Sequence, residues 1–241
     1  MRTLPQRPTL PETTTKRMQK EADAILASSD QKQEAERRHN NARKTIWYAS
    51  VVKALKDMSG VGERCMFCSG SESSQVEHFK PKAVFPEEAM MWDNLLWVCG
   101  ICNQSKGDRF PPYTGPGGQI IDPTIENVWD FFFIDEYGNL TPKWRTDLNS
   151  LDPRAKSTVE NLALDRDALQ QTRQQRIEDL KVRIEDSLSR YRAGELSRAQ
   201  LEGRCREWRK QPFQPDVADY FLAGPGKEES PFREFLVTVG V

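Results

Sequence analysis

Four of the five cysteines in this 241-residue chain form two CxxC pairs, Cys65/Cys68 and Cys99/Cys102, with residues 69–98 between them. Four thiolates from two such pairs can close a tetrahedral zinc site, which has no open coordination position and therefore stabilises structure. A thioredoxin-type redox site instead has a single CxxC after a strand of a βαβ unit, a pattern that neither pair shows. The spacing predicts a structural zinc site, with thiol redox chemistry as the less favoured alternative.

The segment VEHFKPK, residues 76–82, lies between the two pairs and contains one of only two histidines in the chain. His78 follows Glu77 at the end of an expected strand over residues 75–79, and a histidine next to a carboxylate beside a zinc site is a candidate general base or ligand. The other histidine, His39, lies among charged and amide residues (ERRHNNAR) and is expected to be a solvated helix residue. Cys205, in a helical pattern, is expected to be a small buried side chain.

Asn103 directly follows Cys102. If zinc holds the second pair beside the strand that carries Glu77 and His78, the three side chains share one small volume. Glu77 and Asn103 would then offer oxygen ligands to Mg²⁺ or Mn²⁺, which keep several waters and use substrate phosphate as a further ligand. His78 would be free to deprotonate a water, so the set suits hydrolysis of a phosphodiester.

The order CxxC, EHFxPK, WxNLLWxC and CNxxKG resembles the HNH, or ββα-metal, family of endonucleases with accessory zinc knuckles. The resemblance implies a ββα-metal core in which Glu77 is a metal ligand and His78 is the general base. It implies that Asn94 steadies the loop around the base and that Asn103 is the last ligand of the catalytic metal. Lys106 resembles the lysine that follows this asparagine and is expected to contact phosphate.

A wider resemblance covers about residues 40–190, through WYASVVKALKDM, IIDPTIEN and AKSTVENLALDRDALQQTR. These segments resemble the HNH nuclease subunit of Septu-type and retron-linked phage-defence systems. The resemblance implies a DNA substrate and an ATPase partner of the ABC/SMC kind. Relatives carry LNR where this chain has LDR at residues 164–166, so the role of that segment stays open.

Apolar residues make up 37% of the chain and charged residues 29%, a balance that favours helices with wide solvated faces. We expect a mostly α protein around the small ββα core, with a short β-hairpin after it. The predicted regions are a flexible N-terminal lead (1–11), an N-terminal helical region (12–60), the HNH core with its zinc knuckles (61–112), a loop and hairpin (113–156) and a C-terminal helical region (157–241).

Local signals refine the helices. The first helical region is expected to break near residues 28–31, and its second half has an apolar face that we expect to pack in the core rather than bind a partner: Trp47, Val51, Ala54, Leu55 and Met58. Capping-box patterns at Ser157/Glu160 and Ser197/Gln200 each predict a helix start. A helix is expected up to Gly194, and another after Ser230-Pro231.

Strand and loop signals lie in the middle of the chain. Strands are expected over residues 75–79 and 95–98, and a hairpin is expected to pair residues 131–135 with 140–144 across the turn EYGN. A loop rich in Pro and Gly (PPYTGPGG) is expected between these two parts. Prolines and the AGPG turn are expected to interrupt the C-terminal tail.

The formal net charge is −1, so the whole chain lacks the basic excess of a nucleic-acid binder. Residues 166–210 hold twelve basic against eight acidic side chains, whereas residues 62–110 hold five against seven. We therefore expect weak DNA binding by the isolated chain and delivery of DNA by a partner. The sequence has no apolar run of the roughly 18 residues needed to span a bilayer, and its first 20 residues lack the apolar core of a signal peptide. The cytosol is therefore the expected compartment, and no membrane partner is expected. The alternative function is a non-catalytic zinc module that binds a protein or nucleic acid.

Overall fold

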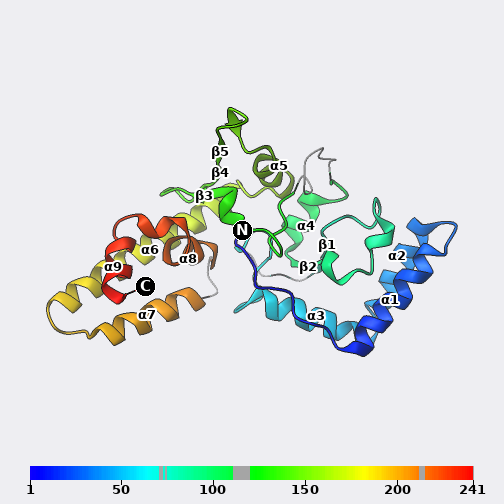
Figure 1. Ribbon diagram of the computed structural model, residues 1–241, viewed down its shortest axis with the longest axis horizontal. Helices are drawn as coiled ribbons and strands as arrows, with labels where there is room; N and C mark the ends of the chain where they lie inside the picture. The colour runs from blue at the N-terminus through cyan, green and yellow to red at the C-terminus, as the bar shows by residue number, and fades with distance from the viewer. Residues whose placement is uncertain (71–72, 74, 111–119, 212–214, 241) are drawn as a thin grey trace.

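The computed structural model describes residues 1–70, 73, 75–110, 120–211 and 215–240. Helices form one group beside the cysteine-bearing centre and a second group at the opposite end of the molecule, with short hairpins between them (Figure 1). The helices are α1 (Glu12–Leu26), α2 (Gln31–Ala42), α3 (Ile46–Ser59), α4 (Gly100–Lys106), α5 (Pro153–Leu162), α6 (Asp167–Arg192), α7 (Arg198–Lys210), α8 (Pro215–Leu222) and α9 (Phe232–Val239), with 3-10 turns η1 (Pro86–Glu88), η2 (Trp92–Asn94), η3 (Val128–Asp130) and η4 (Pro225–Glu228).

The first helical group confirms the expected break and apolar face. Helix α1 ends at Leu26, and α2 begins at Gln31, where the Asp30 side chain accepts a hydrogen bond from the backbone N–H of Gln33. On α3, the side chains that were expected to share a face are buried or packed against the core, namely Trp47, Val51, Ala54, Leu55 and Met58. This face lies against strand β2 (Leu95–Val98).

The centre is a two-stranded antiparallel hairpin followed at once by a short helix. Strand β1 (Gln75–His78) pairs with β2 in a register that sets Glu77 opposite Leu96 and His78 opposite Leu95. Strand β2 is buried along its whole length, which explains its continuous apolar sequence LLWV. Helix α4 then begins directly after Cys99, so the elements follow in the order β, β, α. The first strand ends one residue earlier than expected, at His78, and the second has the expected bounds.

Two small hairpins follow the centre. Strand β3 (Phe132–Ile134) pairs with β4 (Leu140–Pro142), and β5 (Trp144–Arg145) pairs with β6 (Ser150–Leu151). The expected hairpin is therefore present but shorter, because the chain leaves β4 after Pro142 and starts a second pairing. Gly138 in the turn has φ +82°, and a Cβ there would lie 2.4 Å from the Gln170 carbonyl oxygen of α6, so the turn requires glycine.

One of the two predicted helix starts is wrong. Ser157 and Glu160 lie inside α5, which begins at Pro153 with Asp152 as its N-cap. The Asp152 carboxylate accepts hydrogen bonds from the backbone N–H groups of Arg154 and Ala155, and proline at the first helical position adds a second start signal. The Asp152-Pro153 pair, rather than Ser157, therefore sets the start of α5. The capping box of Ser197 and Gln200 is confirmed at the start of α7.

Residues 1–11, expected to be a flexible lead, have no helix or strand up to Pro11 but bury the side chains of Met1, Leu4 and Leu10. The Arg7 guanidinium donates hydrogen bonds to the backbone carbonyls of Trp92, Asp93 and Leu95. Apolar side chains of this proline-containing segment thus occupy core positions, which the composition alone did not indicate. The PPYTGPGG loop and Pro212 lie outside the described residues.

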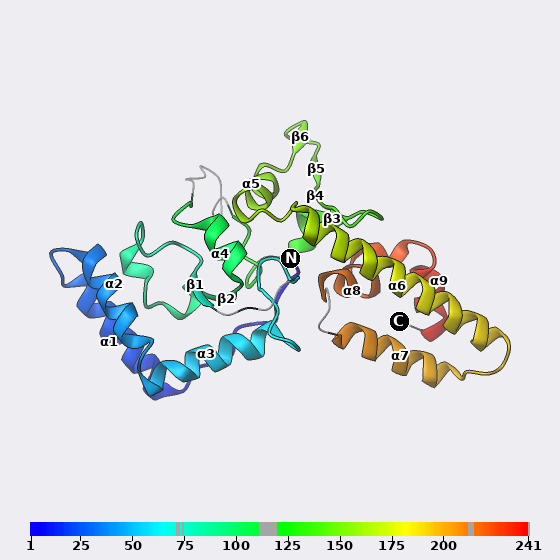
Figure 2. The same cartoon turned by 180° about the vertical axis from the view of Figure 1, so that it is seen from behind.

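The second helical group consists of α6 to α9, seen from behind in Figure 2. Helix α6 ends at Arg192, close to the expected end at Gly194, and α9 follows Ser230-Pro231 as expected. Arg173 and Asp216 form a fully buried ion pair at 3.0 Å in this group. Cys205 is buried, as expected. Within the described residues, no helix combines the length and apolar character needed to cross a membrane.

Candidate functional site

The four paired cysteines form one buried cluster. Their sulfur atoms all lie within 4.8 Å of one another, and Cys68 Sγ is 3.9 Å from Cys99 Sγ. Tetrahedral zinc with Zn–S bonds of about 2.3 Å requires sulfur atoms about 3.8 Å apart. All four are free thiols rather than disulfides. The cluster is therefore positioned to bind a metal ion, and its donor set and spacing fit zinc.

Arg166, the last residue of the LDR segment and the N-cap of α6, lies beside this cluster. The Arg166 guanidinium nitrogen Nη1 lies 4.0 Å from Cys102 Sγ and donates a hydrogen bond to the Ala163 carbonyl at 2.8 Å. Cys102 Sγ also lies 3.9 Å from the Leu162 carbonyl oxygen. A positive charge beside thiolates stabilises their ionised form. The LDR segment, whose role the sequence left open, thus supplies a cation next to the cluster.

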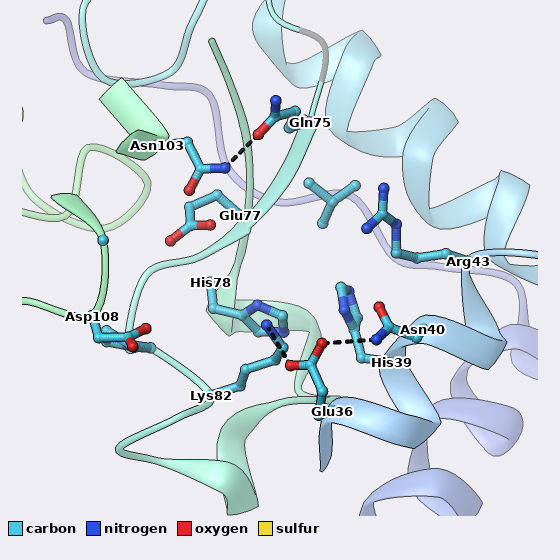
Figure 3. Close-up of a pocket in the computed structure, with 13 residues that line it drawn as sticks. Glu36, His39, Asn40, Arg43, Gln75, Glu77, His78, Lys82, Asn103 and Asp108 are labelled. Atoms are coloured by element: carbon cyan, nitrogen blue, oxygen red, sulfur yellow. Dashed lines mark hydrogen bonds and ion pairs between the residues drawn. The ribbon is translucent and has the colours of Figure 1, made fainter. Parts of the chain in front are cut away.

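Helix α4 connects the cluster to a second set of polar residues, because Asn103 follows Cys102 in the same helical turn. The Asn103 side-chain amide donates a hydrogen bond to Gln75 Oε1. Figure 3 shows that the amide oxygen of Asn103 then faces the Glu77 carboxylate. Gln75 precedes Glu77 by two residues, so both side chains lie on the same face of β1. Sequence reasoning did not single out Gln75, although the alternation of side chains along a strand could have indicated it.

Lys106 lies inside the structure, beside the Glu77 carboxylate. Its side chain is 0% exposed, and Nζ donates to Glu77 Oε1 at 2.9 Å and to the His78 carbonyl at 2.7 Å. Burial lowers the pKa of this ammonium, and the neighbouring Glu77 carboxylate opposes that shift. Lys106 was expected to contact phosphate, but it does not line the cavity described below. The position one helical turn after Asn103 directs it inward, where it holds strand β1.

His78 is buried, and its ring is fixed by the backbone. Its Nε2 atom lies 2.9 Å from the Ala89 carbonyl oxygen. Because a carbonyl can only accept, Nε2 carries the proton and Nδ1 keeps its lone pair. Burial lowers the pKa of His78 to about 4. The imidazole is therefore neutral at pH 7 and able to accept a proton at Nδ1.

His39 is also buried, which corrects its expected position as a solvated helix residue. Its side chain lies in a face of α2 that also contains Ala35 and Ala42, at helical spacing. The ring packs against the His78 ring in a T-shaped arrangement with centroids 4.6 Å apart, and Nε2 is 3.0 Å from the Tyr48 hydroxyl. Burial lowers the pKa of His39 to about 2, so both rings are neutral at pH 7. The polar neighbours in the sequence concealed this inward-facing position.

These residues border a cavity of about 610 Å³ with one wall from α2 and another from β1 and the end of α4 (Figure 3). The lining residues are Glu36, His39, Asn40, Arg43, Gln75, Val76, Glu77, His78, Pro81, Lys82, Asn103, Gly107 and Asp108. Lys82 Nζ pairs with Glu36 at 3.1 Å. Arg43 forms no ion pair with any residue that the structure describes, so its guanidinium is available at the wall. Sequence reasoning did not single out Arg43 or Lys82.

Asn94 lies behind the cavity rather than in its wall. Its side-chain oxygen accepts from the Lys80 N–H at 2.7 Å, and its amide donates to the carbonyls of Lys80 and Glu88, each at 3.0 Å. Glu88 directly precedes Ala89, whose carbonyl fixes His78. The hydrogen bonds of Asn94 thus hold both ends of the loop that follows β1, and they position the acceptor of the His78 ring.

The cavity offers oxygen ligands for a hard cation. Glu77 Oε1 accepts a hydrogen bond from Lys106, and Oε2 has no hydrogen bond to any described residue. The Asn103 amide oxygen points toward the Glu77 carboxylate (Figure 3). Two protein oxygens suit Mg²⁺, which retains waters and takes further ligands from phosphate. Apart from the cysteine cluster, the described residues contain no group of three His, Cys, Asp or Glu side chains close enough to hold an ion.

No protein-family model matches the chain. The chain is 30% identical over 126 residues to a Septu protein, PtuB, from Bacillus thuringiensis. The match covers 50% of this chain and 43% of that relative, so the chain spans less than half the length of the protein it resembles. Half of the chain is thus similar in sequence to a Septu protein.

Proposed function

We propose that the chain is a metal-dependent HNH endonuclease that hydrolyses DNA phosphodiester bonds. The observation that carries this proposal is the convergence of Glu77, His78 and Asn103 on one cavity, next to a cysteine cluster that fixes the helix bearing Asn103. The sequence order of the elements, two antiparallel strands and then a helix, supports it. The cluster would hold structural zinc, and its four thiolates leave no position for substrate.

Glu77 and Asn103 would hold Mg²⁺ or Mn²⁺ through one carboxylate oxygen and the amide oxygen. Such an ion, when bound, stabilises negative charge on phosphate and on the departing oxygen. Gln75 orients the amide of Asn103, and Lys106 fixes Glu77 from the interior. These two contacts would reduce the freedom of the ligands before substrate arrives.

His78 would act as the general base. Its Nδ1 would take a proton from water as that water attacks phosphorus, and one P–O bond to the sugar oxygen would break in line with the attack. The products are a phosphomonoester and a free hydroxyl, whose proton comes from solvent. Ala89 holds the tautomer that this step requires, and His39 supports the ring from the other side.

Arg43 would take over the phosphate-binding role that was expected of Lys106. It lies in the cavity wall directly after the last residue of α2 and has no carboxylate partner among the described residues. A guanidinium can form two parallel hydrogen bonds to a phosphate. This would place the scissile phosphate between α2 and the hairpin.

The similarity to a Septu protein and the sequence resemblance support a role in anti-phage defence. In this role the chain would work with an ATPase of the ABC/SMC kind. The residues near the cavity have more acidic than basic side chains, which weakens DNA affinity. A partner that delivers DNA would compensate for this.

The proposal is tested by nicking of plasmid DNA with Mg²⁺ or Mn²⁺, with and without the neighbouring ATPase. We expect His78→Ala to lower the rate by about 10²- to 10⁴-fold, because it removes the base. Lys53→Ala, an exposed change on α3 outside the cavity, is the matched control. If wild type and His78→Ala were equally active or equally inactive under every condition, the assignment would fail.

A non-catalytic zinc module remains a second candidate, favoured by one observation: the Lys106 ammonium already neutralises Glu77. In that case, Glu77→Ala and Asn103→Ala would change neither divalent-metal affinity nor phage protection. Loss of Mn²⁺ affinity in either variant, with zinc content unchanged, would exclude it.

A further inference from the structure

A second cavity, of about 370 Å³, lies in the C-terminal helical group, away from the candidate active site. It is located at the C-terminal end of α7, which points toward the centre of the molecule and the N-terminal segment (Figure 1). Its lining residues are Arg2, Arg206, Arg209, Lys210, Pro215 and Asp219. Four cations from two segments far apart in the sequence thus meet one carboxylate.

The one carboxylate can balance only one of these four positive charges. Asp219 already accepts a hydrogen bond from the Trp129 indole N–H at 2.8 Å. Arg209 and Lys210 are exposed and form no ion pair with any residue in the described part of the chain. Arg206 approaches Glu202 only at 3.8 Å, and Arg2 donates to the Ser59 carbonyl rather than to an acid. The cavity therefore carries a net positive charge.

Stabilisation of the helix explains only part of this arrangement. Cations in the last turn of a helix interact favourably with its dipole, which accounts for Arg209 and Lys210. It does not account for Arg2, which comes from the N-terminal segment, or for Arg206 one turn earlier. Like charges that meet in a cavity repel each other, and a bound anion relieves this repulsion.

We propose that this cavity binds the sugar-phosphate backbone of DNA. Among the residues that the structure describes, those lining the cavity include no aromatic side chain, so they offer cations for phosphate and no surface on which a base could stack. Binding there is independent of base sequence. The inference rests on the proposed nuclease function, because it supplies DNA affinity that the acidic surroundings of the active site lack.

The test is the affinity of the 241-residue His78→Ala chain for a short DNA duplex, measured by fluorescence anisotropy across a salt titration. Adding R209A/K210A is expected to weaken binding by about tenfold at low salt. It should also reduce the slope of log K against log salt by about 0.9 for each lost phosphate contact. The control pair, K20A/K227A, removes the same charge at positions outside both cavities and should change neither quantity strongly.

Three results of this test would overturn the inference that the cavity binds DNA. Unchanged affinity and slope in R209A/K210A, or no DNA binding by the parent chain, would overturn the inference. So would binding of ATP that is lost in R209A/K210A while duplex affinity is unchanged, because the occupant would then be a nucleotide. Nicking is measured separately with His78 intact. A wild-type chain that binds DNA through this cavity but never nicks it would refute the proposed function alone.

Discussion

The Asn103 side-chain amide donates a hydrogen bond to Gln75 Oε1, across the junction between α4 and β1. An amide group has one oxygen and one NH₂, so engaging the NH₂ decides where the oxygen points. In this case it points toward the Glu77 carboxylate (Figure 3). Gln75 thus controls the direction of a candidate metal ligand.

Gln75→Ala should therefore lower nicking by about 10- to 100-fold, because Asn103 would lose its orientation. Gln75→Glu keeps the acceptor and should retain more activity. The measurement is the nicking rate as a function of Mn²⁺ concentration, together with zinc content. We expect the zinc content to be unchanged and the Mn²⁺ dependence to move to higher concentration. Wild-type rates for Gln75→Ala at limiting Mn²⁺ would contradict this role.

Lys106→Met should destabilise the fold by about 3–5 kcal/mol. The substitution keeps the approximate length of the side chain but removes the donor for the His78 carbonyl and the counter-charge beside the largely buried Glu77 carboxylate. Urea unfolding measures the change. The double variant with Glu77→Gln should lose less than the sum of the two single changes, and strict additivity would argue against direct coupling.

Cys99→Ser should abolish stoichiometric zinc binding and lower the unfolding temperature, because a closed tetrathiolate site contributes directly to folding. Cys205→Ser is the matched control, since Cys205 is a buried free thiol outside the cluster. Metal analysis and thermal unfolding with and without a chelator give the readout. Equal zinc content in the two variants would show that the cluster does not hold the metal.

Lowering the pH below about 6.5 should reduce the free energy of unfolding, and part of this loss should depend on His39. Burial lowers the pKa of His39 to about 2, whereas an unfolded histidine titrates near about 6.5. Below that pH the unfolded chain binds a proton that the folded chain excludes. The free energy of unfolding therefore decreases by about 1.4 kcal/mol for each unit by which the pH is lowered. His39→Gln removes this term. Urea unfolding at pH 7 and pH 5 should therefore show a smaller loss in the variant, and equal losses would contradict the expectation.

The sequence was most informative where chemistry depends on short-range spacing. The two CxxC pairs predicted the cysteine cluster. Because Asn103 directly follows Cys102 at the start of a helix, and Glu77 lies on the adjacent strand, the sequence also predicted that the two side chains are close together. The burial of His39 depends instead on how α2 packs on the hairpin, and no local pattern encodes that packing. The inward direction of Lys106 was not predicted for the same reason: spacing placed it one turn after Asn103 but did not place it on the inner face.

The cavity is shared between two stretches of chain that the sequence appeared to separate. Helix α2 and its C-cap supply His39 and Arg43, while the hairpin and α4 supply Glu77, His78 and Asn103. A fragment restricted to residues 61–112 would retain the cysteines yet lack one wall and the ring that packs against His78. The smallest portion that could be grafted into another protein, or exchanged between relatives by recombination, therefore starts upstream of α2 and extends through α4.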